Sequence, residues 1–241
     1  MERDNNTAIL EARDVCLNYG YIRAVRGVSI LVREKQVVSL LGPNGAGKST
    51  LIAGIMGVKR PVSGTIKYMG EDITRKSTDR IVVSGISITP EGRGSISLLT
   101  VKENLLLGLL YVKKDKKKCL NDIYERFPML LKKQNQIAGT LSGGEQQILE
   151  IARVIISEPN LIILDEPTLG LSPVAVEDIF VKIKELKDEG YTILVSEQNA
   201  KKALEVSDYG YVLETGRLRL EGDSKKLKDD PWVHKAYLGQ T

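Results

Sequence analysis

Residues 42–50 have the types and spacing of a loop that binds phosphate. Their sequence is Gly42, Pro43, Asn44, Gly45, Ala46, Gly47, Lys48, Ser49 and Thr50. The three glycines let the backbone fold tightly around an anion with its amides pointing inward. Lys48 would reach the β and γ phosphates of a nucleotide, and the Ser49 hydroxyl would hold Mg²⁺. This loop therefore predicts that the chain binds a nucleoside triphosphate.

The segments on either side are those that a phosphate-binding loop needs. The apolar run 37–41 precedes the loop and predicts a buried strand, while Leu51, Ile52, Ile55 and Met56 follow it at helical spacing. The amino terminus of that helix would add the positive end of its dipole. A chance glycine-rich turn lacks this setting, so the order of strand, loop and helix favours a nucleotide site.

A second apolar run, 161–164, ends in two carboxylates, Asp165 and Glu166. Acids at the carboxyl end of a buried strand lie where open α/β sheets bind ligands, so we expect them beside the phosphate loop. Asp165 would hold the water shell of Mg²⁺. Glu166 would orient and polarise a water molecule against the γ phosphate.

A Ser-Gly-Gly-Glu sequence forms the other strong motif: Ser142, Gly143, Gly144 and Glu145. Apolar residues follow it at helical spacing, which places the motif at a helix amino terminus. Bare amides and a hydroxyl at such a terminus form a second anion site. The same residues also make an ordinary helix cap, and the pattern alone leaves both interpretations open.

Residues 8–32 and 64–73 alternate apolar and polar side chains, as strands with one buried face do. Turns near residues 18–21 and near Gly70 interrupt them, so we expect antiparallel strands beside the nucleotide-binding core. Tyr19 lies just before the first turn. Its ring would either stack on a nucleotide base or pack as an ordinary residue at a strand end.

The block from about 92 to 156 is predicted to be helical throughout. Thr100 and Glu103 have the spacing of a capping box that opens a helix reaching Leu110. A second helix keeps its apolar period until Pro128 ends it. Because the neighbouring segments alternate strand and helix, this block is interpreted as an inserted helical subdomain.

Two further segments lie before and within this block. A β-branched run, 81–88, leads into a loop at 89–94 that contains Pro and Gly. Residues 113–118 comprise five lysines and one aspartate. This run would serve either as a solvated connector or as a contact for acidic lipid headgroups.

After the helical block, strand and helix alternate again. Apolar spacing predicts a long helix from Pro173 and a core strand at 191–195 that runs into the polar residues 196–199. Beyond Gly216 we expect a charged tail with short helical stretches. The chain, 1–241, would then be a single α/β domain. Residues 1–91 and 157–241 would form the core with an antiparallel β subdomain, and about 92–156 the inserted α-helical subdomain.

Composition bounds the possible functions. The chain has 241 residues, a formal charge of +4 and 42% hydrophobic residues, which is ordinary for a globular protein. No face is basic enough on composition alone to indicate a nucleic-acid partner. Cys16 and Cys119 are isolated and predict reduced thiols in a cytosolic compartment. We expect no secretory signal, and the longest apolar run, 105–112, is too short to cross a bilayer, so a membrane role would need a partner.

In chain order, residues 42–49, 141–147 and 161–166 resemble the Walker A, signature and Walker B elements of ABC-type ATPases. The resemblance covers essentially the whole chain. It implies a P-loop NTPase core (RecA-like) that binds ATP and Mg²⁺. It also implies that Tyr19 stacks on adenine, that Asp165 supports the metal, and that Glu166 is the general base.

The resemblance implies a partner as well. In that family, the signature helix of one subunit closes on the nucleotide that another subunit holds. Ser142 and Gly144, with Gly143 and Glu145 beside them, would then contact ATP bound to a second chain. Two ATP molecules would close the pair, and hydrolysis would remove the phosphate bridge and open it.

Three positions depart from the family pattern. Glu91 replaces the Gln that usually faces the metal and the membrane partner, and an acid binds Mg²⁺ more strongly than an amide does. Gln198 replaces the switch histidine; it would hydrogen-bond a phosphate but cannot become cationic. Ser172 replaces an Asp in the loop after Walker B. Because Lys48 and both Walker B acids are in place, we still expect hydrolysis.

Five short segments narrow the resemblance: 90–93, 99–104, 170–173, 197–200 and 235–239. They resemble the second ATPase subunit of high-affinity importers for branched-chain amino acids. The chain would then lie at the cytoplasmic face of the cell membrane as a peripheral protein. Its partners would be a second ATP-binding subunit, two transmembrane permease subunits and, indirectly, an external solute-binding protein.

Other functions stay open. An importer of urea, or of another amino acid or amide, is a close alternative, although there we expect Gln in place of Glu91. A non-transport ABC ATPase would carry a fused second cassette, a coiled-coil insertion or zinc-binding cysteine pairs, and the sequence has none of them. A phosphotransferase that shares only the phosphate loop would pass phosphate to a small acceptor instead of water.

Overall fold

The centre of the fold is a six-stranded sheet in the order β10-β9-β3-β8-β7-β6. The computed structural model describes residues 7–92, 94–112 and 114–238. The strands are β3 (Val37–Leu41), β6 (Ile86–Thr89), β7 (Leu161–Asp165), β8 (Ile193–Glu197), β9 (Tyr209–Glu214) and β10 (Arg217–Asp223). All run parallel except β10, which is antiparallel to β9. The carboxyl ends of β3, β7 and β8 therefore meet at one edge of the sheet.

The central strands are buried on both faces. Every residue of β3, β7 and β8 is buried, as expected for parallel strands covered by helices. Alternate residues enter two separate apolar cores, with Leu41 and Leu164 in one and Leu40 and Ile163 in the other. A slip of one residue would exchange these two sets, so the alternation fixes the register of the strands.

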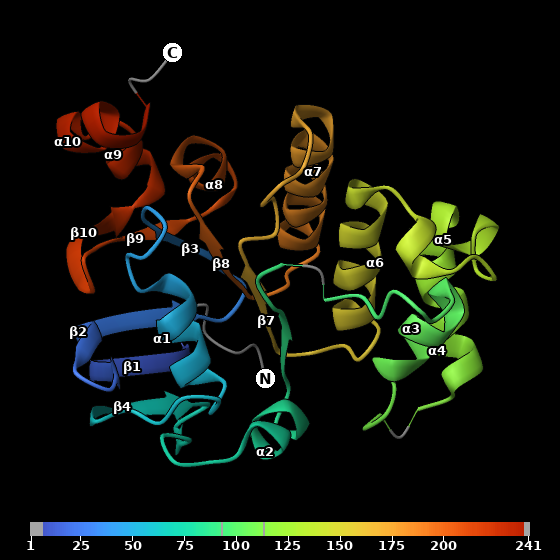
Figure 1. Ribbon diagram of the computed structural model, residues 1–241, viewed down its shortest axis with the longest axis horizontal. Helices are drawn as coiled ribbons and strands as arrows, with labels where there is room; N and C mark the ends of the chain where they lie inside the picture. The colour runs from blue at the N-terminus through green and yellow to red at the C-terminus, as the bar shows by residue number, and fades with distance from the viewer. Residues whose placement is uncertain (1–6, 93, 113, 239–241) are drawn as a thin grey trace.

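A second sheet is antiparallel and has the order β2-β1-β4-β5. Its strands are β1 (Ala8–Tyr19), β2 (Ile22–Arg33), β4 (Ser63–Tyr68) and β5 (Glu71–Asp72). This confirms the antiparallel strands predicted beside the core. Figure 1 shows β1, β2 and β4 grouped beside helix α1 (Lys48–Ile55) at one end of the molecule. A Cβ on Gly54 of α1 would come within 2.7 Å of Leu17 of β1, so helix and sheet are closely packed.

The block between β6 and β7 is helical in its described part, as predicted. It contains α3 (Val101–Leu107), α4 (Lys116–Arg126), α5 (Pro128–Lys132), the 3-10 turn η1 (Ala138–Thr140) and α6 (Gly143–Ile155). The capping box of Thr100 and Glu103 opens α3, because each side chain accepts a hydrogen bond from the backbone N–H of the other. Figure 1 places these helices at the end of the molecule away from the antiparallel sheet.

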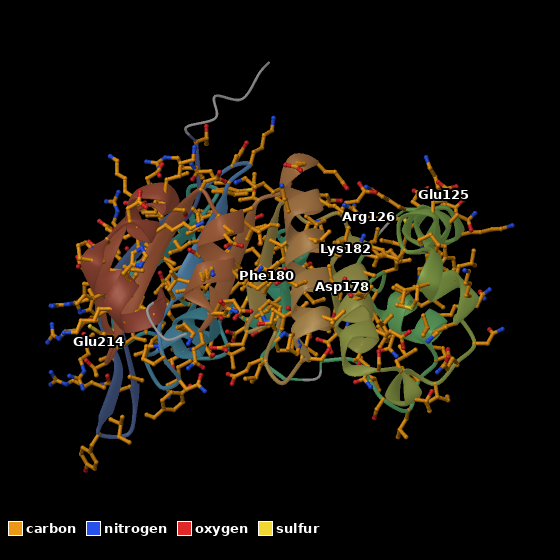
Figure 2. All side chains as sticks on the ribbon, turned by 90° about the horizontal axis from the view of Figure 1, so that it is seen from above. Glu125, Arg126, Asp178, Phe180, Lys182 and Glu214 are labelled. Carbon is orange, nitrogen blue, oxygen red and sulfur yellow. The ribbon has the colours of Figure 1, made fainter. Side chains whose placement is uncertain are left out.

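Helix α7 (Pro173–Asp188) packs between the helical block and the central sheet. Figure 2 shows Arg126 at the end of α4 and Lys182 of α7 close to each other. The Lys182 ammonium lies 5.8 Å from the centre of the Phe127 ring, within range of a cation–π contact. Helix α7 thus shares one apolar core with the central sheet and the helical block through buried residues such as Ile183, and Lys182 adds a polar contact with the block.

Several boundaries differ from the sequence predictions. The run 81–88 is two elements, because helix α2 (Thr78–Val83) takes its first half and β6 its second. The helix predicted to reach Leu110 ends at Leu107. Its next residue, Gly108, is so close to α6 that a Cβ there would lie 2.3 Å from the Arg153 carbonyl oxygen. Contact with α6 therefore limits α3, and an apolar period along one helix does not reveal that contact.

The C-terminal region also needs correction. The strand predicted at 191–195 is β8, which begins and ends two residues later. The predicted tail of short helices begins instead with β10, followed by α9 (Ser224–Lys228), α10 (Pro231–Val233) and the π-helical turn η2 (His234–Leu238). Between β8 and β9 lies α8 (Ala200–Val206). Strand β10 lies at the edge of the sheet, pairs with β9 and is half exposed, so it tolerates charged residues. Those charged residues hid the strand from the sequence prediction.

Some segments singled out in the sequence extend beyond the described residues. Arg93, Lys113 and Gly239 lie outside them, as do residues 1–6. Within the described ranges, no helix combines the length and apolar character needed to span a bilayer.

Candidate nucleotide-binding site

The phosphate loop joins β3 to α1, and its backbone conformation depends on glycine. Gly45 and Gly47 have φ angles of 80° and 106°, in the left-handed region. A Cβ on Gly47 would lie 2.6 Å from the carbonyl oxygen of Ala24 and 3.5 Å from the Cα of Gly216. Gly216 also donates its N–H to the carbonyl oxygen of Ala46 at 2.9 Å. The loop is thus held between β2 and the turn that joins β9 to β10.

Lys48 begins helix α1, and its side chain returns over the phosphate loop. It is only 3% exposed. Its Nζ donates to the carbonyl oxygens of Gly42 and Pro43 at 2.7 and 3.1 Å, and it forms an ion pair with Glu166 Oε1 at 2.7 Å. These three acceptors match the three hydrogens of the ammonium. A phosphate entering the loop would therefore compete with Glu166 for this lysine.

The Ser49 hydroxyl lies between two carboxylates. Its Oγ is 2.9 Å from Glu91 Oε2 and 3.2 Å from Asp165 Oδ1. A hydroxyl has one proton, so it donates to only one of these oxygens at a time. The three groups come from the start of α1, the segment after β6 and the end of β7. The structure thus brings together three oxygen-bearing side chains that are far apart in the sequence.

This donor set fits Mg²⁺, which binds oxygen ligands through one or two carboxylates together with phosphates and waters. Among the described residues, no three or more His, Cys, Asp and Glu side chains are grouped to hold a metal ion. Phosphate oxygens would therefore have to complete the coordination that Ser49, Asp165 and Glu91 begin.

The charge state of Asp165 is sensitive to its surroundings. Burial raises the pKa of its carboxyl group, and hydrogen bonds from Ser196 and Ser49 offset part of that rise. The negative charges of Glu91 and Glu166 raise the pKa further. A cation bound beside Asp165 would act in the opposite direction and favour the carboxylate.

Glu166 has a backbone conformation that is rare for a residue with a side chain. Its φ is 51°, in the left-handed region. Its N–H is 3.1 Å from both the carbonyl oxygen and the hydroxyl of Ser196 in β8. The same hydroxyl donates to Asp165 Oδ1. The sequence predicts no role for Ser196, although a polar residue at the end of a buried strand is a signal for one.

Tyr19 and Gln198 lie outside this set of contacts. Tyr19 ends β1, is 50% exposed, and has the Lys59 ammonium 4.5 Å from the centre of its ring. The ring therefore makes a cation–π contact and still keeps half of its surface free. Gln198 follows β8 directly and is exposed. Both side chains are accessible to a ligand, and their contacts with a nucleotide remain predictions.

The Ser142 motif forms the helix cap that the sequence allowed. The Ser142 hydroxyl accepts from the N–H of Glu145 at 3.4 Å, and Glu145 Oε2 accepts from the N–H of Ser142 at 3.0 Å. Glu145 Oε1 also pairs with Lys133 at 2.6 Å. These contacts lower the pKa of Glu145, the hydrogen bond from Lys133 most. The Glu145 carboxylate thus serves the cap, and its contact with a nucleotide remains a prediction.

The glycines of this motif pack against the start of α7. A Cβ on Gly144 would lie 2.9 Å from the Cβ of Ala175, and one on Gly143 would lie 3.2 Å from Leu171. Ser172 caps α7 by accepting the N–H of Ala175 at 3.4 Å. Within the described residues, no hydrogen bond or ion pair joins Ser142 to the phosphate loop. The structure therefore does not bring the two predicted anion sites of one chain into contact.

The amino-acid sequence is similar to those of known ATP-binding proteins. A family model for ABC transporters matches residues 25–169. The high-affinity branched-chain amino acid transport ATP-binding protein BraG of Pseudomonas aeruginosa is 44% identical over 92% of this chain and 95% of its own length. The probable branched-chain amino acid transport ATP-binding protein LivF of Archaeoglobus fulgidus is 36% identical over 94% and 98%.

A solved structure shows the same fold. The crystal structure of an ATP-binding cassette of an ABC transporter in its ADP conformation is similar with a TM-score of 0.84 at 32% identity, covering 98% of this chain and 100% of that one. This confirms the predicted α/β fold with its P-loop core. The chain therefore belongs to the ABC transporter family and is one of its ATP-binding cassettes.

Proposed function

We propose that this chain is the ATP-hydrolysing subunit of an importer for branched-chain amino acids (leucine, isoleucine and valine). The observation that carries the hydrolytic part is the convergence of Lys48, Ser49, Asp165 and Glu166 at one edge of the sheet. The solute is inferred from the names of BraG and LivF and from short segments such as 170–173. The fold of a cassette does not by itself identify the solute, so transport assays test this part of the proposal.

ATP would lie with its phosphates in the loop 42–50 and its adenine on Tyr19. The loop amides and the start of α1 supply positive partial charge to the phosphates. Ser49, Asp165 and Glu91 would hold Mg²⁺, which neutralises negative charge on the β and γ phosphates when bound. Half of the Tyr19 surface is free, which suits stacking on a base.

The Lys48–Glu166 ion pair supports a specific order of events. An arriving γ phosphate attracts Lys48 and thereby releases the Glu166 carboxylate from its partner. Glu166 then accepts a proton from the attacking water, whose oxygen bonds to the γ phosphorus. The bond from that phosphorus to the bridging oxygen breaks, and its electron pair leaves with ADP. Gln198 would hydrogen-bond the γ phosphate from the end of β8.

The separation of Ser142 from the phosphate loop supports a site shared by two chains. We propose that Ser142, Gly143 and Gly144 present a hydroxyl and free amides to the γ phosphate held by a second ATP-binding subunit. The resemblance to the importer subunits favours a non-identical second subunit. Nucleotide charge would then hold the two chains together until hydrolysis.

We also propose that the chain divides into two units that move relative to each other. Residues 1–91 and 157–241 would form the nucleotide-binding core with its β subdomain, and about 92–156 the helical subdomain. A groove of about 310 Å³ lies where α2 and β6 face α3 and α6. Exposed Val83 and Tyr111 line it, together with Val112. Its apolar lining suits a segment of a permease subunit.

The groove has a physical link to the Glu91 segment. Arg153 lines it and donates from Nη2 to the carbonyl oxygen of Gly94 at 2.8 Å. A change at Glu91 on nucleotide binding would therefore reach the groove over a few residues. This arrangement supports a location at the cytoplasmic face of the membrane, on two permease subunits that receive solute from an external binding protein.

Uptake by cells that lack this subunit tests the proposal. Cells complemented with the wild-type chain should accumulate leucine, isoleucine and valine but not urea, while Lys48→Ala should abolish uptake because it removes the phosphate-binding ammonium. Uptake of urea instead would assign the chain to the other importer class. Full leucine uptake with Lys48→Ala would contradict the role of the phosphate loop.

A further inference from the structure

Glu197, the last residue of β8, is a buried acid that the proposed hydrolytic step does not use. It is 2% exposed. Its Oε1 accepts two hydrogen bonds from one residue, the N–H of Thr168 at 3.2 Å and the Thr168 hydroxyl at 2.7 Å. Thr168 is itself buried. Burying a carboxyl group is costly unless hydrogen bonds compensate. Thr168 supplies two of them, one from its backbone and one from its side chain, and the backbone of Asn199 supplies another.

The two last residues of β8 hold successive parts of the loop after β7. Ser196 receives the Glu166 N–H and donates to Asp165, while Glu197 receives both donors of Thr168. The loop between these anchors contains Glu166 in its left-handed conformation. A conformation of that kind persists only where its surroundings hold it in place. Glu197 therefore closes the far end of the segment that carries the proposed general base.

We propose that Glu197 is a positioning residue for hydrolysis, which acts through Thr168 to keep the Glu166 carboxylate aimed at the attacking water. This inference rests on the proposed function, because it takes Glu166 as the general base. In the described part of the chain, the side chains of Lys48 and Ser49 bond to the loop carbonyls and to Glu166, Glu91 and Asp165, and not to Glu197. Loss of Glu197 should therefore affect the rate of the chemical step far more than the affinity for ATP.

The pKa of Glu197 is consistent with a buried position near Glu166. Burial raises the pKa of Glu197, and the hydrogen bond of the Thr168 hydroxyl lowers it in part. The negative charge of Glu166 raises it again, which indicates that the two carboxylates are near each other. The carboxylate of Glu197 thus lies near the proposed base and is bonded to Thr168, two residues after that base in the sequence.

Four variants test the inference in the assembled transporter. Glu197→Ala removes the acceptor and should lower kcat by up to about 100-fold, the effect expected from a small displacement of a catalytic group, with KM for ATP changed less than about twofold. Glu197→Gln keeps an acceptor oxygen of the same reach and should restore most of the rate. Thr168→Val removes only the hydroxyl donor and should give an intermediate loss, whereas Thr168→Ser should not.

A matched control is Thr192→Val. Thr192 is buried, and its hydroxyl accepts the N–H of Lys35 at 2.9 Å, away from the phosphate loop. This variant makes the same chemical change and should leave kcat unchanged. If burying valine in place of threonine had a general effect, kcat would fall in Thr168→Val and in Thr192→Val alike. A similar loss of kcat in the two variants would overturn the inference.

Amide hydrogen exchange over residues 165–168 gives a readout that does not depend on activity. Exchange should speed up in Glu197→Ala and return toward the wild-type rate in Glu197→Gln. Unchanged exchange in Glu197→Ala, or equal loss of kcat in the Ala and Gln variants, would overturn the positioning role. If Glu197→Ala does not fold, the same comparison is made with Thr168→Val.

The proposed function and this inference fail in different ways. Glu166→Gln measured alongside reports on the proposed base alone. Rapid hydrolysis by Glu166→Gln would remove Glu166 from its role, whatever exchange at residues 165–168 shows. Slow hydrolysis by Glu166→Gln together with normal kcat in Glu197→Ala would leave the base in place and refute the inference.

Discussion

Lys48 and Glu166 form an ion pair in which Nζ lies 2.7 Å from Oε1, with both side chains almost fully buried. While this ion pair lasts, one carboxylate oxygen of Glu166 is bonded to Lys48 and not to a water molecule. The lysine nearest to where the γ phosphate would lie therefore restrains the proposed base before ATP arrives. This pairing links the arrival of nucleotide to the release of the base.

The first prediction concerns Glu166. Glu166→Gln should keep ATP binding, because the phosphate loop is unchanged, but lower kcat by about 10²- to 10⁴-fold, the range for loss of a general base. With hydrolysis blocked, the ATP-bound pair of subunits should accumulate. Single-turnover hydrolysis and size-exclusion chromatography with the partner subunit check both effects. Turnover at the wild-type rate would place the base elsewhere.

The second prediction separates the cap at Ser142 from its proposed contact with phosphate. Ser142→Ala and Thr100→Ala each remove the side chain of a capping box, so each should lower the free energy of unfolding by about 1 kcal/mol. Only Ser142→Ala should also weaken ATP-driven association with the second subunit. Chemical denaturation and ATP-dependent association, measured on both variants, distinguish the two roles. Equal association of the two variants would leave Ser142 as a cap alone.

The third prediction concerns Glu91, whose Oε2 lies 2.9 Å from the Ser49 hydroxyl. Glu91→Gln should leave ATP affinity intact, raise the Mg²⁺ concentration needed for half-maximal hydrolysis, and alter stimulation by the permeases, because an amide is a weaker ligand for a hard cation. Glu71→Gln is the control, since Glu71 pairs with Lys76 on the antiparallel sheet. If the Mg²⁺ dependence and the stimulation by the permeases were both unchanged, Glu91 would have no role as a metal ligand or in coupling to the permeases.

The fourth prediction follows from the raised pKa of Asp165. Its ordinary value is 3.8, and the folded chain holds the proton to higher pH than the unfolded chain does. The free energy of unfolding should therefore fall as pH rises through the raised pKa. Asp165→Asn cannot ionise, so it should stabilise the nucleotide-free chain at about pH 7, by an amount that shrinks toward about pH 4.

Asp72 gives a control of opposite sign. Hydrogen bonds from Thr74 lower its pKa, so its carboxylate stabilises the fold above its ordinary pKa, and this contribution is lost as pH falls. Asp72→Asn should therefore destabilise the chain slightly at about pH 7 and not at low pH. Denaturant titrations at several pH values check both variants. Lower stability of Asp165→Asn at neutral pH would contradict the fourth prediction.

Two parts of the site could be predicted from the sequence: residues that are consecutive in the chain, and residues that follow parallel strands. The phosphate loop could be recognised because strand, glycines, Lys48 and helix are consecutive. Asp165 and Glu166 could be placed beside it because the carboxyl ends of parallel strands share one edge of the sheet. The spacing of residues along the chain was therefore enough to identify the chemical groups of the site.

Contacts between distant segments were not predictable in this way. Glu197 was visible as a polar residue at a strand end, but nothing in its spacing identifies Thr168 as its partner. The end of α3 depends on how close Gly108 comes to Arg153, and β10 forms because β9 offers it an edge. Pairings between separate elements decide these features, and a single sequence does not display them.

Gly216 is far from the phosphate loop in sequence, yet it packs on Gly47 and donates a hydrogen bond to Ala46. A side chain there would push on Ala24, since a Cβ would lie 2.5 Å from the Ala24 carbonyl oxygen. A genetic screen for loss of uptake should therefore recover alleles at this hairpin turn, outside every recognisable motif. Such alleles would be misread as folding defects unless nucleotide affinity were measured directly.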